Sequence, residues 1–337
     1  MDEDKSGNSL KETIKGTILE ILENPDIIKT EKIDYIIFGY DLISEKETER
    51  KSSDIYMKRI LINEKVRNEV KKQLLLNLKH LNNEEVKFID WGSAADSPKD
   101  SVEIADIDII DKSLRPILLN PNTDSQVIME ELDKWKHVGL LAIINLDDNE
   151  AVQNTCNLII GINSLTRQNI ALKKRKGITI SGDGVLQYIE KVRVFTLSDL
   201  YDAIFICNKL LIMNENHFYR LFVLNEYFNS FFKNNENTIN KYIKDTGILY
   251  KRISGDIRRE KKLISAINNV LDKNPEPSDY EDVYQKYKDK VGKVTFFEHK
   301  IDVSQSDINA VLDLLHLDFD EDPMFHSKRR VSPRYGR

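Results

Sequence analysis

The spacing of apolar residues along the chain predicts strands and helices in its first half and long helices mainly in its second half. Runs with strand-like spacing occupy residues 35–40, 55–62, 86–91, 102–110, 137–145, 157–163, 170–180 and 294–301. Runs with helical spacing occupy residues 10–22, 63–81, 124–135, 217–245, 256–272, 278–290 and 306–315. Asn63 and Ser306 are candidate N-caps, and the charged residues 44–53 indicate a solvent loop. We therefore expect an α+β fold, with a mixed-sheet α/β N-terminal half and a C-terminal half that adds a sheet and helices.

The stretch 193–233 carries the strongest pattern. Two short apolar runs, Ala203–Cys207 and Leu210–Met213, are separated by a turn expected at Asn208-Lys209, which predicts a hairpin. Asn214 or Asn216 can then cap a long helix. One face of this helix is expected to carry Phe218, Leu221, Phe222, Tyr227, Phe228, Phe231 and Phe232. So much aromatic area must be buried, and the preceding hairpin is the expected partner.

Composition restricts the class of protein. A chain of 337 residues that is 40% hydrophobic and 31% charged can form one large domain or two ordinary ones. No apolar run reaches the length of a membrane span, and the N-terminus is acidic, so we expect a cytoplasmic protein. Cys156 and Cys207 lie in apolar runs and are expected to be buried small hydrophobes rather than a disulfide or a metal pair.

The net charge is −6, but cations are concentrated in a few segments. The first is the expected strand that contains Arg167, Lys173, Lys174, Arg175 and Lys176, and no acid. Single charges of this kind protect the edge of a sheet. Four consecutive charges in a strand face both sides of a sheet, which favours contact with a phosphate backbone.

Two further segments are basic. In the helix expected over 256–272, Arg258, Arg259, Lys261 and Lys262 are predicted to lie on the outer faces. If this helix face lies beside the basic strand, the two would form one surface suited to the backbone of a duplex. The tail contains Lys328, Arg329 and Arg330 and follows an acidic stretch, so it fits a disordered terminus as well as a nucleic-acid arm.

The order of a basic strand, a hairpin and an aromatic helix that begins near a Phe resembles the B subunit (KwaB) of the Kiwa anti-phage defence system. The resemblance covers residues 135–337 and includes Val311–Leu315 and the polar tail from His326. It implies homodimerisation, sequence-independent binding of double-stranded DNA, and a membrane-protein partner that would recruit the chain to the inner face of the membrane. The expected domains are residues 1–150 (α/β), 151–322 (the KwaB-like core) and 323–337 (a basic tail).

Two alternatives remain open. A metal-dependent nuclease would use Asp106, Asp108 and Lys87, because two-metal sites need clustered carboxylates, often with a lysine nearby. An adaptor would use the basic segments to bind an acidic protein. The histidines lack metal-ligand spacing and no phosphate-binding glycine loop is present, so we expect no cofactor, no metal and a non-catalytic DNA-binding role.

Overall fold

The computed structural model describes most of the chain. The exceptions are residues 1–2, 41, 47–48, 53–54, 61, 94–99, 120–136, 147–155, 166–169, 174–176, 181–185, 190–191, 196–198, 223 and 317–337. The helix expected over 124–135 and the tail that contains Lys328, Arg329 and Arg330 lie outside the described residues.

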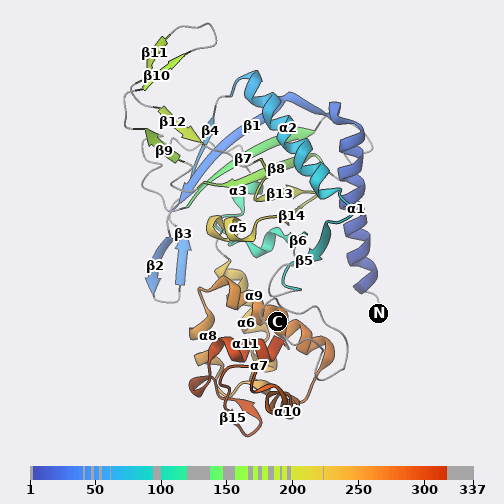
Figure 1. Ribbon diagram of the computed structural model, residues 1–337, viewed down its shortest axis with the longest axis vertical. Helices are drawn as coiled ribbons and strands as arrows, with labels where there is room; N and C mark the ends of the chain where they lie inside the picture. The colour runs from blue at the N-terminus through green and yellow to red at the C-terminus, as the bar shows by residue number, and fades with distance from the viewer. Residues whose placement is uncertain are drawn as a thin grey trace.

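An eight-stranded sheet forms the centre of the protein, in the order β4-β1-β7-β8-β13-β14-β6-β5 (Figure 1). Its strands are β1 (Ile28–Tyr40), β4 (Tyr56–Ile60), β5 (Lys87–Asp90), β6 (Ser101–Asp106), β7 (His137–Leu146), β8 (Leu158–Ser164), β13 (Ala203–Ile206) and β14 (Lys209–Ile212). All neighbours are antiparallel except β5 and β6, which are parallel. With the helices described below, this mixed sheet confirms the α+β class.

Helices cover both faces of the sheet. Helices α1 (Glu3–Glu23) and α2 (Glu64–Leu81) pack on one face, where Ile18 and Leu74 belong to the same core cluster as Ile37 of β1. The other face is covered by α3 (Pro116–Leu119) and α5 (Glu215–Leu221). Successive residues of a strand point to opposite faces, so the two covered faces explain why the central strands are apolar at consecutive positions.

The predicted hairpin is confirmed as β13 and β14, but its turn lies one residue earlier than expected. Cys207 and Asn208 are the central residues, with φ of 51° and 60°. Positive φ at both positions matches the right-handed twist of the strands. Asn214 is the N-cap of α5, and its side chain accepts the backbone N–H of His217.

The aromatic helix expected over 217–245 is wrong as one element. It consists of α5, α6 (Asn225–Asn234) and α7 (Glu236–Tyr242). Phe218 and Phe222 pack beneath the sheet, whereas Phe228 and Phe232 belong to a separate core. The chain leaves the helix at Phe222 because its aromatic residues serve two different cores.

That second core belongs to a helical unit beside the β5–β6 end of the sheet (Figure 1). Its elements are α6, α7, α8 (Thr246–Ile253), α9 (Ile257–Lys273), α10 (Pro277–Tyr287), β15 (Phe296–Phe297), β16 (Lys300–Ile301), η4 (Val303–Gln305) and α11 (Ile308–His316). The expected boundary near residue 150 falls between β7 and β8, which are neighbours in one sheet. The sheet therefore continues across that boundary, and the second core begins only with α6.

Several short elements differ from the expectation. The expected loop over 44–53 contains the antiparallel strands β2 (Leu42–Lys46) and β3 (Glu49–Ser52). These strands have no apolar alternation, so polarity alone predicted a loop. Asp307, rather than Ser306, accepts backbone N–H groups at the start of α11. The structure also contains the 3-10 turns η1 (Pro25–Ile27) and η2 (Ile107–Ile109).

Candidate functional site

The expected basic strand is two strands in two small sheets. Lys173 ends β9 (Ile170–Lys173), which pairs with β12 (Val192–Phe195), and β10 (Gly177–Ile180) pairs with β11 (Leu186–Ile189). Neither pair belongs to the eight-stranded sheet. Four of the candidate cations, Arg167, Lys174, Arg175 and Lys176, lie outside the described residues.

Charge in this part of the sequence is uneven. Residues 166–198, which we call the ribbon segment, contain seven Lys or Arg and two acids. The register of the β9–β12 pair places Leu172 opposite Arg193 and Lys173 opposite Val192, so two cations occupy adjacent rows. In Figure 1 the β10–β11 pair stands clear of the central sheet at the upper left.

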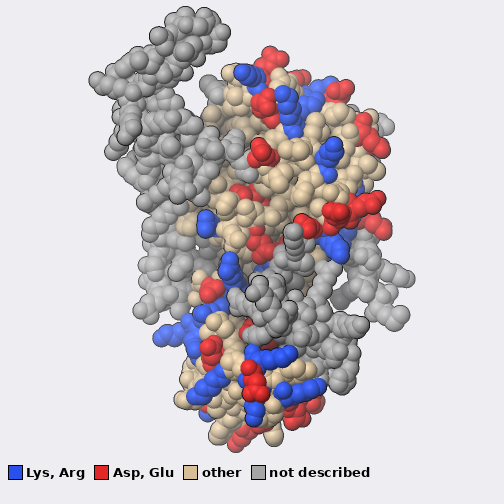
Figure 2. Space-filling view, in the orientation of Figure 1, with Lys and Arg blue, Asp and Glu red and all other residues tan. Residues whose placement is uncertain are grey.

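The four cations of α9 do not form the open basic face that the sequence predicted. Arg258 is exposed and donates to Asn216, and Arg259 lies 3.4 Å from Asp256. Lys262 contacts Asp313 at 2.5 Å. On the face shown in Figure 2, cations and acids alternate over the helical unit.

Lys261 corrects the sequence prediction most clearly. Its side chain is only 2% exposed, and its ammonium group forms ion pairs with Glu103 of β6 and Glu215 of α5. Lys261 and Glu103 are both buried, and burial of a charge is tolerated only where an opposite charge compensates it. Lys261 therefore joins the helical unit to the sheet and cannot contact a duplex in this arrangement.

Two aromatic side chains complete this buried network. Tyr219 donates its hydroxyl to Glu103 over 3.1 Å, and Trp91 donates its indole N–H to the Tyr219 oxygen over 2.9 Å. Burial and the nearby Glu103 raise the pKa of Tyr219 far above its ordinary value, so its hydroxyl stays protonated. The strand β6 is covered on both sides, with Glu103 facing this network.

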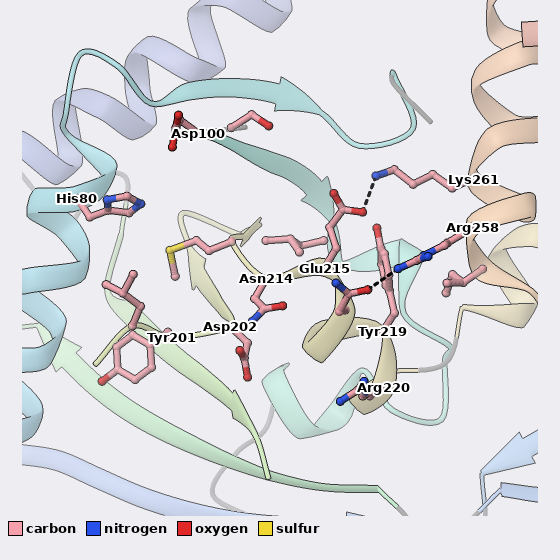
Figure 3. A pocket seen from close by; sticks show the side chains of 16 residues that line it. His80, Asp100, Tyr201, Asp202, Asn214, Glu215, Tyr219, Arg220, Arg258 and Lys261 are labelled. Atoms are coloured by element: carbon pink, nitrogen blue, oxygen red, sulfur yellow. Dashed lines mark hydrogen bonds and ion pairs between the residues drawn. The ribbon is translucent and has the colours of Figure 1, made fainter. Parts of the chain in front are cut away.

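A cavity of about 700 Å³ adjoins the network, between the sheet and α9 (Figure 3). Its lining includes Asp100, Asp202, Arg220, Arg258 and Lys261, so both signs of charge are present. A mixed lining of this kind suits polar ligands of either charge and favours no single class of ligand.

Asp202 and His217 form a pair beside the cavity. His217 Nδ1 lies 2.9 Å from the Asp202 carboxylate, which also accepts the backbone N–H of Ser164. Burial raises the pKa of Asp202, while that N–H and His217 oppose the shift. Such a pair can orient an imidazole for proton transfer, but it also ties α5 to the start of β13.

The acids of the nuclease alternative are engaged elsewhere. Asp106 contacts Lys209 at 2.5 Å and Asp108 contacts Arg115 at 2.9 Å, and both acids are largely exposed. Among the residues that the structure describes, no three His, Cys, Asp or Glu side chains are grouped so that they could hold a metal ion.

The chain matches no protein-family model, no curated protein and no solved structure. In the part of the chain that the structure covers, no helix combines the length and apolar character needed to cross a bilayer.

Proposed function

We propose that the chain is a non-catalytic component of a Kiwa-like anti-phage defence system that binds double-stranded DNA without reading its sequence. The observation that carries the proposal is the excess of cations in the ribbon segment, whose strands lie outside the central sheet. Ladder hydrogen bonds hold the backbone at Lys173 and Arg193 in the β9–β12 pair, which lowers the backbone conformational cost of binding a phosphate backbone there.

The resemblance to the Kiwa B subunit adds the biological setting. The hairpin β13–β14 followed by the Phe-containing helix α5 is the order on which that resemblance rests. From it we propose a cytoplasmic homodimer that a membrane-protein partner recruits to the inner face of the membrane. A small multi-span membrane protein encoded beside this gene would support that setting.

Duplex binding in EDTA tests the DNA-binding proposal. Anisotropy of a labelled duplex of arbitrary sequence should report binding that weakens roughly a thousandfold over a fourfold rise in salt, if about six phosphates are engaged. An unrelated duplex should bind equally well. Absence of binding at low salt, or binding that salt does not weaken, would refute the proposal, and magnesium-dependent cleavage would favour the nuclease instead.

A further inference from the structure

The two cysteines of the chain lie at the same end of neighbouring strands. Ile159 of β8 pairs with Ile206 of β13, and Cys207 directly follows Ile206. Cys156 precedes β8, and its sulfur lies 3.4 Å from the carbonyl oxygen of Leu158. The backbone register therefore brings both cysteines to one corner of the sheet.

Both side chains also share one side of that corner. They pack against the core beneath α1, where the sulfur of Cys207 lies 3.7 Å from Thr17 Oγ1. Each thiol shifts the pKa of the other through a side-chain interaction, so the two sulfurs are neighbours at this corner. The prediction that both cysteines are buried is confirmed for Cys156, whereas Cys207 is half-buried.

The two thiols differ in reactivity. Cys156 is 4% exposed, whereas Cys207 is half-buried. The interaction with Cys156 lowers the pKa of Cys207 to about 7, against the effect of burial. The same interaction and burial raise the pKa of Cys156 well above its ordinary value. Cys207 is thus the more readily ionised and more nucleophilic of the two thiols, and Cys156 keeps its proton.

We propose that Cys207 and Cys156 form a reversible intramolecular disulfide when the folded protein meets a peroxide. The Cys207 thiolate attacks one peroxide oxygen, the O–O bond breaks, and a sulfenic acid and hydroxide result. The Cys156 sulfur then attacks the Cys207 sulfur, an S–S bond forms, and the S–O bond breaks. The Cys156 proton leaves with the departing oxygen as water. Two thiols and one peroxide thus give one disulfide and two waters.

The turn that carries Cys207 suits this role. Cys207 and Asn208 both have positive φ in a tight two-residue turn, so the sulfur is held by β13 and β14 rather than by a long loop. The new bond would close a covalent loop that contains β8, the ribbon segment and β13. This inference does not depend on DNA binding.

Peroxide treatment of the folded protein tests the disulfide. After treatment, quenching and denaturation, we expect no free thiols, a monomer mass lower by two hydrogens, and a proteolytic peptide that joins Cys156 to Cys207. Dithiothreitol should restore both thiols. Retention of both thiols in the folded protein, or a disulfide found only between two chains, would overturn the proposal.

Single substitutions separate the two roles. In Cys156→Ser, Cys207 should accumulate a sulfenic acid that a cyclic diketone traps, and in Cys207→Ser, Cys156 should remain a free thiol. Equal oxidation of the two variants would contradict the assigned order of attack. Circular dichroism before treatment shows whether each variant is folded. The peptide map of the unsubstituted protein shows whether the disulfide forms even if a variant does not fold.

Discussion

Asp111 and Glu226 each bind the backbone beside the other, across the junction of the sheet and the helical unit. Asp111 Oδ1 accepts the N–H of Glu226 over 2.9 Å, and Glu226 Oε2 accepts the N–H of Lys112 over 2.9 Å. Asp111 thus binds an N–H in the first turn of α6 from a distant part of the sequence. Two carboxylates placed so close together make this contact sensitive to pH.

The free energy of unfolding should fall as the pH rises through the range in which Asp111 loses its proton. Burial, with Glu226 adding to it, raises the pKa of Asp111 from 3.8 to about 7. The folded state therefore binds a proton that the unfolded chain releases, so this stabilisation is complete below about pH 4 and is lost by about pH 7. Asp111→Asn keeps an acceptor for Glu226 and removes the titration. The free energy of unfolding of this variant, relative to that of the unsubstituted protein, should increase by on the order of 4 kcal/mol between pH 4 and pH 8.

Urea unfolding at several pH values measures this difference. Asp289→Asn, at an exposed position after α10, removes an acid without touching the junction and serves as the control. If the free-energy difference between Asp111→Asn and the unsubstituted protein does not change with pH, Asp111 does not titrate as proposed.

Loss of Lys261 should be severe because it leaves the buried carboxylate of Glu103 uncompensated. Lys261→Ala is expected to destabilise the protein by about 3–5 kcal/mol. Lys261→Met combined with Glu103→Gln removes both charges and should recover much of that loss, because Tyr219 can still donate to the amide oxygen. Lys251→Ala, an exposed position in α8, should change stability little. Denaturant unfolding compares the variants, and equal losses at Lys261 and Lys251 would rule out a structural role for the network.

Local signals predicted the strands of the central sheet and the caps Asn63 and Asn214, whereas contacts between residues remote in sequence determined the burial of Lys261 and the break after Phe222. Asn63 and Asn214 cap the helices that follow them because the cap lies within the same few residues. The residues next to Lys261 in the sequence are typical of an exposed helix face. Its burial depends on Glu103, which is remote in sequence. The break after Phe222 has no Gly or Pro to mark it, since it results from two cores.

The acids Asp106 and Asp108 should be dispensable for function. Each is largely exposed and forms an ion pair with a nearby cation, and exposed pairs contribute about 0–1 kcal/mol. We expect Asp106→Asn combined with Asp108→Asn to leave DNA binding and any protection against phage unchanged. A folded double variant that lost protection together with magnesium-dependent cleavage would instead establish the nuclease.

The ribbon segment should contribute more to DNA binding than the tail. Replacement of Lys173, Lys174 and Lys176 with Gln removes three cations, so duplex affinity should fall by an order of magnitude or more and the salt slope by roughly three units. Deletion of residues 331–337 removes only two arginines, so it should have the smaller effect. Lys65→Gln, Lys288→Gln and Lys293→Gln together remove the same charge from exposed positions elsewhere and provide the matched control. Anisotropy titrations on proteins with equal thermal melting decide between the segments. The DNA-binding surface would lie outside the ribbon segment if the tail deletion reduced duplex affinity more than the ribbon substitutions did. The same would follow if the control substitutions reduced duplex affinity equally.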